Sequence, residues 1–241
     1  MKIGITLPQF SADAPAMVAA ARRAEGEGID AVFAYDHYPR PGRPEALHGL
    51  TMLGGLAIAT DTMLLGTLVA RIGVVPDAVL ISAVRTACRL AEGRFVAGLG
   101  VGDKQSDIED QALGVSRPTL EERFVRLEHV AATLTHEGID VWIGGRSRRA
   151  ATLSAALGVG RNLWEPTEQQ LQEALEEAEG RPVTWGATIE IGDDVGVGAL
   201  ADKLADLAGR GVVVAIVAPM KAGAADAASR VMHAKKLAGL P

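Results

Sequence analysis

The chain has 241 residues, of which 48% are hydrophobic and 4% aromatic, and it carries a formal net charge of −6. This length fits a single domain over residues 1–241, while the acidic balance and the lack of a lysine- or arginine-rich run exclude nucleic acid and an anionic membrane surface as expected partners. The one cysteine, Cys88, excludes an intramolecular disulfide, and no apolar stretch of membrane-spanning length is free of charge, so we expect a soluble, cytoplasmic protein.

Strand-like and helix-like patterns alternate along the chain. Apolar runs without helical periodicity predict strands over residues 2–7, 30–35, 63–69, within 93–103, 140–143, 159–163, 182–189 and 212–217. Amphipathic periodicity, caps and glycine stops predict helices over residues 13–28, 47–60, 76–93, 120–138, 147–157, 168–179, 200–207 and 222–240, with a loop at 101–117. Eight such units with short links predict an α/β fold, a closed (β/α)8 TIM barrel; an open doubly wound sheet is the structural alternative.

The stretch Gly-Arg-Phe-Val-Ala-Gly-Leu-Gly-Val-Gly-Asp at residues 93–103 is the most informative strand. Gly98, Gly100 and Gly102 would let another group approach its far end closely, as in a parallel strand that ends in a ligand-facing loop. A buried glycine-rich strand without a ligand is the alternative. A dinucleotide fingerprint is disfavoured, because the spacing is GxGxG and the polar run 103–110 does not open an apolar-faced helix.

In such a barrel, functional groups gather at the carboxyl ends of the strands. Asp36 and His37 follow the second predicted strand, where neighbouring residues point different ways, so that one could face the pocket while the other braces the loop. Histidine titrates near neutral pH, which makes His37 the best candidate for a general acid or base. A loop histidine or a salt-bridged turn is the alternative.

The segment Gly144-Gly145-Arg146-Ser147 joins a predicted strand to a predicted helix. Bare glycine N–H groups, the positive end of the helix, a serine cap and the Arg146 guanidinium together predict a phosphate-binding turn. A bound phosphate would also explain why Arg71, Lys104 and Arg146 fall at the same end of the barrel. Scattered surface cations are the alternative.

Other chemistry finds little support in the sequence. No GxSxG motif or HxD pairing is present, and no His, Cys or carboxylate spacing resembles a metal site. Cys88 lies in an alanine-rich helical pattern, which favours packing over a catalytic thiol. Lys104 and Lys221 lie beyond the apolar runs, where a Schiff-base lysine would be poorly desolvated, so a phosphosugar isomerase or aldolase barrel is disfavoured.

Six segments form a recognisable series. They are Lys2-Ile3-Gly4 with Gln9, GIDAVF at 28–33 leading to Asp36-His37, LGTLV at 65–69 with Pro76, AEGRFVAGLGVG at 91–102, Glu122-Arg123, and VWIGGRS at 141–147. In this order they resemble the bacterial luciferase-like family of flavin and deazaflavin oxidoreductases over nearly the whole chain. The pair GRFVAGLGVG and VWIGGRS is the most specific part of the resemblance.

The resemblance implies a luciferase-like barrel that binds the deazaflavin coenzyme F420, with FMN as the alternative. The ring would lie over the second to fourth strands, with a non-prolyl cis peptide bond near Leu68–Val69. Asp36 and His37 are the implied catalytic residues, with His37 as acid/base or stabilising the intermediate. The implied cofactor-binding residues are Asp36, His37, Leu68, Val69, Gly100, Gly102, Ser106, Gly144, Gly145, Arg146, Ser147 and the pocket-walling Trp164.

The function that the resemblance implies is an oxidoreductase that transfers a hydride between F420 and an unidentified small organic substrate. An FMN-dependent luciferase-like monooxygenase and a non-catalytic flavin- or deazaflavin-binding protein are the alternatives. The resemblance also implies a homodimer. The long insertion of larger members is missing between residues 134 and 141 and the loop 192–198 is short, so we expect shortened insertion loops and a more open site.

Overall fold

The computed structural model describes residues 1–39, 42, 45–103, 106–221 and 226–241. Nine strands lie within these ranges: β1 (Lys2–Thr6), β2 (Ala31–Ala34), β3 (Leu64–Thr67), β4 (Ala70–Arg71), β5 (Phe95–Gly100), β6 (Asp140–Gly144), β7 (Gly160–Trp164), β8 (Val183–Glu190) and β9 (Val214–Met220). They pair in parallel in the order β1, β2, β3, β5, β6, β7, β8, β9, and β9 pairs with β1, while β4 pairs with β5. The predicted (β/α)8 TIM barrel is therefore confirmed.

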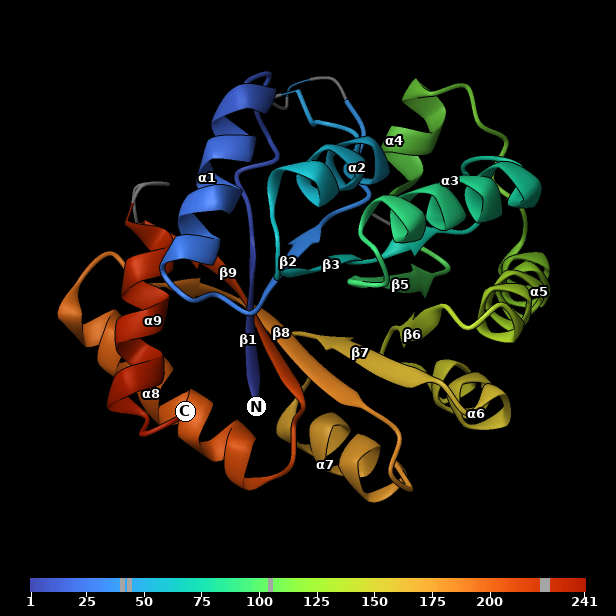
Figure 1. The fold of residues 1–241 in the computed structure, drawn as a ribbon. Helices are drawn as coiled ribbons and strands as arrows, with labels where there is room; N and C mark the ends of the chain where they lie inside the picture. Colours follow the sequence, from blue (N-terminus) through green and yellow to red (C-terminus); the bar gives the residue numbers. More distant parts are fainter. Residues whose placement is uncertain (40–41, 43–44, 104–105, 222–225) are drawn as a thin grey trace.

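Helices surround the strands (Figure 1). They are α1 (Ala14–Gly26), α2 (Gly49–Ala59), α3 (Asp77–Leu90), α4 (Ser106–Ala112), α5 (Leu120–His136), α6 (Arg148–Leu157), α7 (Glu168–Glu176), α8 (Asp194–Gly209) and α9 (Ala227–Leu237). Asp13 caps α1 as predicted, because its side chain accepts a hydrogen bond from the Ala16 N–H. Among the helices of the described ranges, none combines the length and the apolar character needed to cross a membrane.

Two helices differ from the prediction. α4 lies inside the stretch 101–117 that was expected to be a loop, where Asp103 Oδ1 accepts a hydrogen bond from the Ser106 N–H at 3.0 Å. α8 begins at Asp194 rather than at residue 200, because the Asp193 side chain accepts from the Gly196 N–H at 2.8 Å and caps it. The expected short loop at 192–198 is therefore mostly helix. The helix predicted over 222–240 begins with residues 222–225, which lie outside the described residues.

The strand predicted over residues 63–69 is interrupted near its end. The Leu68–Val69 peptide bond is cis, as expected, and β4 follows it. The Val69 side chain packs where β5 and β6 lack side chains: a Cβ at Gly100 would lie 2.5 Å from Val69 Cγ2, and one at Gly144 would lie 2.7 Å from Val69 Cγ1. The glycines at these two positions therefore make room for the Val69 side chain. Packing alone explains why glycine stands at residues 100 and 144.

Gly100→Ala is expected to lower the free energy of unfolding by about 1–3 kcal/mol, because the added methyl group overpacks the barrel against Val69. Adding Val69→Ala should recover most of that loss. Gly198→Ala is the control: a Cβ at this half-buried α8 position has nothing within 4 Å, and the change should stabilise the chain by about 0.4–1 kcal/mol. Urea unfolding measures all three variants. A Gly100→Ala protein as stable as the unmodified chain would contradict the packing argument.

The interior of the barrel is filled below its mouth. Phe33, Val96, Trp142 and Ile216 pack together there, and the rings of Phe33 and Trp142 stack with their centroids 5.6 Å apart. A larger apolar layer separates the strands from the helices. Because the interior is packed, the room for a ligand lies at the carboxyl ends of the strands.

Candidate active site

His37 stands at the mouth of the barrel, just after β2, and is held by a carboxylate. Its Nδ1 lies 2.9 Å from Oε1 of Glu109 in α4, and the side chains of His37 and Glu109 are 40% and 3% exposed. A carboxylate can only accept a hydrogen bond, so Nδ1 donates and Nε2 is left as the nitrogen that can exchange a proton. The buried Glu109 therefore orients a solvent-accessible imidazole.

Asp36 contacts Arg71. Its Oδ2 accepts a hydrogen bond from the Arg71 N–H at 2.6 Å and lies 3.7 Å from Arg71 Nε. The two neighbouring residues thus have different partners, with His37 bound to Glu109 and Asp36 bracing the loop against β4. The carboxylate in contact with the imidazole is that of Glu109, which the sequence analysis did not single out.

Arg71 is buried, with 6% of its side chain exposed, and is surrounded by carboxylates. Its guanidinium nitrogens lie 3.0 Å from Glu109 and 3.2 Å from Asp110, besides the contact with Asp36. Burial raises the pKa of the Asp110 carboxyl, and Arg71 opposes that rise. The expectation that Arg71 helps to hold a phosphate is wrong, because these carboxylates occupy it. Lys104, expected at the same face, lies outside the described residues.

The turn predicted to bind phosphate joins β6 to α6 and is exposed after Gly144. Ser147 caps α6, as expected, and Arg146 Nη1 donates a hydrogen bond to the Glu165 carbonyl at 2.8 Å. Gly145 has a φ of +118°, which favours glycine, and its N–H donates to the Asn162 carbonyl at 3.2 Å. The prediction that this N–H is bare is therefore wrong. The Arg146 guanidinium and the first turn of α6 remain as donors for an anion.

Aromatic rings form a wall beside His37. The ring centroid of His37 lies 5.4 Å from that of Phe10 and 5.8 Å from that of Tyr35. Trp164, which ends β7, meets Tyr35 edge-on at 5.8 Å. Leu68 belongs to the apolar cluster against which Tyr35 and Trp164 pack. The structure therefore brings two predicted residues, His37 and Trp164, to the same rim of the barrel through Tyr35.

Three residues predicted along the cofactor's tail have structural reasons of their own. Gly100 leaves room for Val69, and Gly102 has a φ of +70° with a Cβ position only 2.9 Å from Arg117 Nη2. Ser106 is buried, and its hydroxyl donates to Asp103 Oδ1 at 3.1 Å. Their contact with a cofactor stays a prediction.

Gln9, which follows the first strand, fixes the loop that carries Asp36 and His37. It is fully buried, and its Nε2 donates to the carbonyls of Tyr35 at 2.7 Å and Leu47 at 2.6 Å. Its Oε1 accepts from the Tyr35 N–H at 2.7 Å. Gln9, three residues beyond the end of β1, thereby holds both ends of this loop at the mouth.

The carboxyl ends of the parallel strands carry a partly exposed histidine held by a buried glutamate, an aromatic wall, and a helix start that favours anions. The chain is therefore a (β/α)8 barrel whose candidate active site lies at the end where such barrels carry theirs. No group of three His, Cys, Asp or Glu side chains in the described ranges is arranged to hold a metal ion.

The family of the chain follows from comparison with known proteins. The model of the luciferase-like monooxygenase family matches residues 1–128, and the chain belongs to this family. A relative from Intrasporangium calvum, named F420-dependent glucose-6-phosphate dehydrogenase, is 36% identical over 120 residues. The match covers 46% of this chain and 34% of the relative, so the chain aligns with about a third of that protein's length.

Solved structures share the fold over nearly the whole chain. An F420-dependent secondary alcohol dehydrogenase in complex with an F420-acetone adduct superposes with a TM-score of 0.77 at 13% identity, covering 98% of each chain. The coenzyme F420-dependent tetrahydromethanopterin reductase from Methanopyrus kandleri superposes with a TM-score of 0.76 at 13% identity, covering 96% of this chain and 97% of the reductase chain. At these identities the likeness shows the luciferase-like barrel fold.

Proposed function

We propose that the chain is an oxidoreductase that uses coenzyme F420 and transfers a hydride between this coenzyme and a small organic substrate. The observation that carries the proposal is the His37–Glu109 pair, which holds an accessible imidazole at the mouth of a luciferase-like barrel. The name of the Intrasporangium relative, an F420-dependent dehydrogenase, supports F420 over FMN.

The residues at the mouth fit a flat, phosphorylated cofactor. Phe10, Tyr35 and Trp164 offer apolar ring faces beside the imidazole, above the cluster that contains Leu68. Arg146 is exposed, donates a hydrogen bond to the neutral Glu165 carbonyl, and stands at the start of α6, where an anion is stabilised. When bound, the coenzyme would supply the hydride chemistry.

The chain's own residues would orient the reactants and handle the proton. His37 Nε2 would take the hydroxyl proton of an alcohol substrate, or return it to the oxygen in the reverse direction. Glu109 would keep the imidazole in the tautomer with its proton on Nδ1. Asp36 would act through Arg71, whose backbone it binds, while contact of Asp36 with the ring stays a prediction.

Titration with F420 and, separately, with FMN tests the proposal. We expect F420 to change its fluorescence on binding and to raise the melting temperature of the protein, because a ligand that binds only the folded chain stabilises it. A larger response to FMN would favour the FMN-dependent alternative. Should both coenzymes leave fluorescence and melting temperature unchanged, the proposal fails.

Arg146→Met is expected to weaken F420 binding about tenfold, because a charge-assisted hydrogen bond is worth roughly 1.5–3 kcal/mol and this one would be partly exposed. The melting temperature of the cofactor-free protein should stay unchanged, since Arg146 is at the surface. Arg85→Met is the matched control: this partly exposed arginine of α3 lies outside the candidate site and pairs with Glu137. Fluorescence titration gives both dissociation constants, and equal values would contradict a phosphate contact by Arg146.

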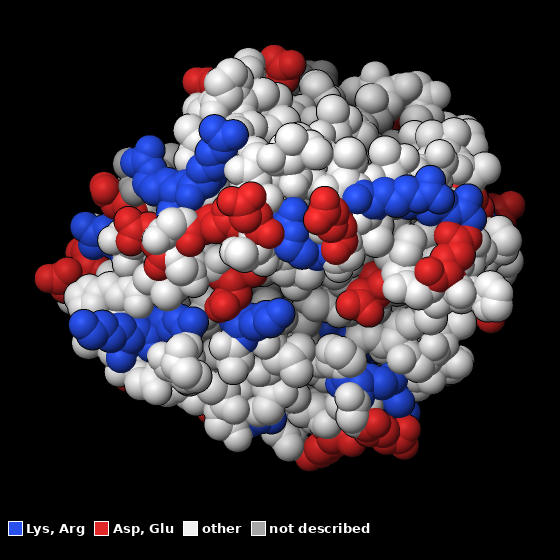
Figure 2. Space-filling view, in the orientation of Figure 1, with Lys and Arg blue, Asp and Glu red and all other residues white. Residues whose placement is uncertain are grey.

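We also propose that the chain forms a homodimer through α2. The sequence of this helix contains no charged residue, and Ile58 on it is 71% exposed. Figure 2 shows that the surface over this part of the molecule is largely uncharged. Burying such a patch is favourable, so sedimentation equilibrium should give twice the monomer mass of 25.1 kDa. A monomer mass at micromolar concentration would contradict this proposal.

A further inference from the structure

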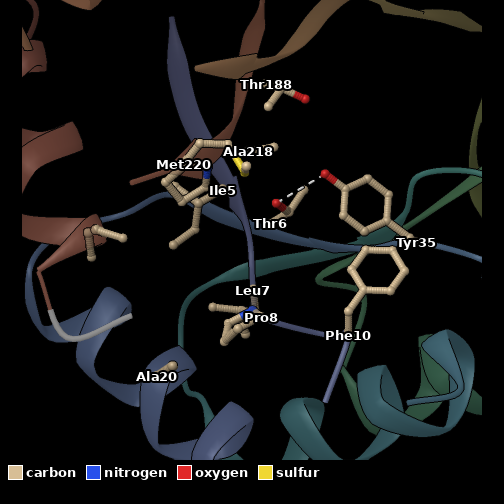
Figure 3. A pocket seen from close by; sticks show the side chains of 13 residues that line it. Ile5, Thr6, Leu7, Pro8, Phe10, Ala20, Tyr35, Thr188, Ala218 and Met220 are labelled. Atoms are coloured by element: carbon tan, nitrogen blue, oxygen red, sulfur yellow. Dashed lines mark hydrogen bonds between the residues drawn. The ribbon is translucent and has the colours of Figure 1, made fainter. Parts of the chain in front are cut away.

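A cavity of about 330 Å³ opens beside the aromatic wall (Figure 3). It runs from the mouth of the barrel over the ends of β1 and β9 toward α1 and α9. Its lining residues are Ile5, Thr6, Leu7, Pro8, Phe10, Ala20, Tyr35, Thr188, Ala218, Pro219, Met220, Ala227 and Ala228. The volume is at the small end of the range for ligand pockets.

The cavity borders the candidate proton-transfer residue. Phe10 and Tyr35 both line it, and these are the two rings that pack against His37. A molecule in the cavity would therefore be separated from the imidazole only by the aromatic wall, or would reach it at the open rim. The proximity links the cavity to the site described above.

The polar side chains of the described lining residues are hydroxyls. None of the lining residues that the structure describes carries a charge, and the polar side chains among them are the hydroxyls of Thr6, Tyr35 and Thr188. The Tyr35 hydroxyl donates to Thr6 Oγ1 at 3.2 Å, as Figure 3 shows. Burial raises the pKa of Tyr35 to about 12, so the phenol stays neutral and keeps its proton.

We propose that this cavity binds an uncharged organic molecule with an apolar body and a single hydroxyl or carbonyl group, a small alcohol or ketone. The apolar walls would bury the body, and the Thr6–Tyr35 hydroxyl pair would bond the one oxygen. An ionised group is disfavoured, because the described lining residues offer it no partner of opposite charge. That the bound molecule is also the substrate rests on the proposed function; the binding itself does not.

Binding of three probe molecules to the cofactor-free protein tests the proposal. They are cyclohexanol, the anion cyclohexanecarboxylate with the same ring, and glucose 6-phosphate, each measured by chemical-shift titration. We expect cyclohexanol to bind at least tenfold more tightly than either anion. Binding of an anion as tight as that of cyclohexanol would overturn the proposal, as would the absence of cyclohexanol binding.

Two cavity variants and one surface control locate the binding. Ala20→Leu, on the face of α1 that lines the cavity, should weaken cyclohexanol binding at least tenfold by filling the space, whereas Ala132→Leu, at an exposed position of α5, should leave it unchanged. Thr6→Val, which keeps the shape and removes the hydroxyl, should weaken cyclohexanol but not cyclohexane. If Ala20→Leu does not fold, Thr6→Val decides alone. Cyclohexanol binding that is unaffected by Thr6→Val, and by Ala20→Leu where that variant folds, overturns the proposal.

These measurements separate this proposal from the proposed function, because no coenzyme is present. Cyclohexanol binding without any response to F420 would contradict the proposed oxidoreductase function and support the proposed ligand class of the cavity. A response to F420 without cyclohexanol binding would support the proposed function and contradict the proposed ligand class of the cavity.

Discussion

Replacing His37 with alanine should lower turnover by about 10²- to 10⁴-fold, the range that a general acid or base contributes. The dissociation constant of F420 should change far less, because the imidazole is expected to act on the proton while the rings of the wall and Arg146 hold the coenzyme. Stopped-flow reduction or reoxidation of F420 in the presence of an accepted alcohol or ketone measures turnover, and fluorescence titration measures binding.

His129→Ala is the matched control, because His129 lies exposed on α5, remote from the mouth. It should retain the unmodified rate. Equal turnover in the His37→Ala and unmodified proteins would end the assignment of His37. A fall in coenzyme affinity as large as the fall in turnover would instead make His37 a binding residue.

Variants of Glu109 give a second test of the role assigned to His37. If Glu109 acts by orienting His37, the effects of Glu109→Gln and His37→Ala on turnover should not add, since residues that act as a unit are strongly non-additive. In the His37→Ala background, Glu109→Gln should then cost little further turnover. Additive losses would indicate that Glu109 serves the reaction independently of the imidazole.

The sequence predicted the barrel and much of its rim, because both depend on local patterns. Apolar runs mark the strands, and the residues that follow them, such as His37 and Arg146, must lie at one end of a parallel barrel. The caps at Asp13 and Ser147 follow from side-chain chemistry within three residues. These features need no knowledge of which strands lie opposite one another.

The contact of Glu109 with His37 could not be predicted from such local patterns. The helix that carries it has no apolar stripe, and ion pairs hold it: Glu109 and Asp110 meet Arg71, and Arg117 pairs with Asp107 and Asp110. Such a helix forms because of tertiary contacts, which a periodicity argument does not register. The available signal was a dense run of carboxylates after a strand that leads to the rim.

The N–H of Gly145 was misjudged for a related reason, and the packing role of Gly100 was not predicted. Gly145 has its N–H bonded to Asn162, and Gly100 faces Val69, because β6 lies between β5 and β7 in a particular register. Register between strands far apart in the chain cannot be deduced from glycine spacing alone. A glycine-rich strand end therefore indicates a close approach without saying whether a ligand or a neighbouring side chain makes it.

Replacing Arg71 with methionine should lower the free energy of unfolding by about 3–5 kcal/mol, because breaking a buried ion pair leaves uncompensated buried charge. Three carboxylates, those of Asp36, Glu109 and Asp110, would lose their shared cation. Methionine keeps an apolar stem of similar length, so the lost charge, rather than a cavity, should dominate. Urea unfolding at pH 7 measures the loss.

The pH dependence and a surface control distinguish charge from packing. The Asp110 pKa is already raised by burial, and removing Arg71 should raise it further, so the folded variant takes up a proton before the unfolded chain does as the pH falls. Its deficit in stability should therefore shrink between pH 7 and the ordinary carboxyl range near pH 4. Lys221→Met, which breaks the exposed pair with Glu190, should leave the stability nearly unchanged, because water screens an exposed ion pair. A deficit in the Arg71→Met protein that is equally large at every pH would show that lost packing, not stranded carboxylates, destabilises it.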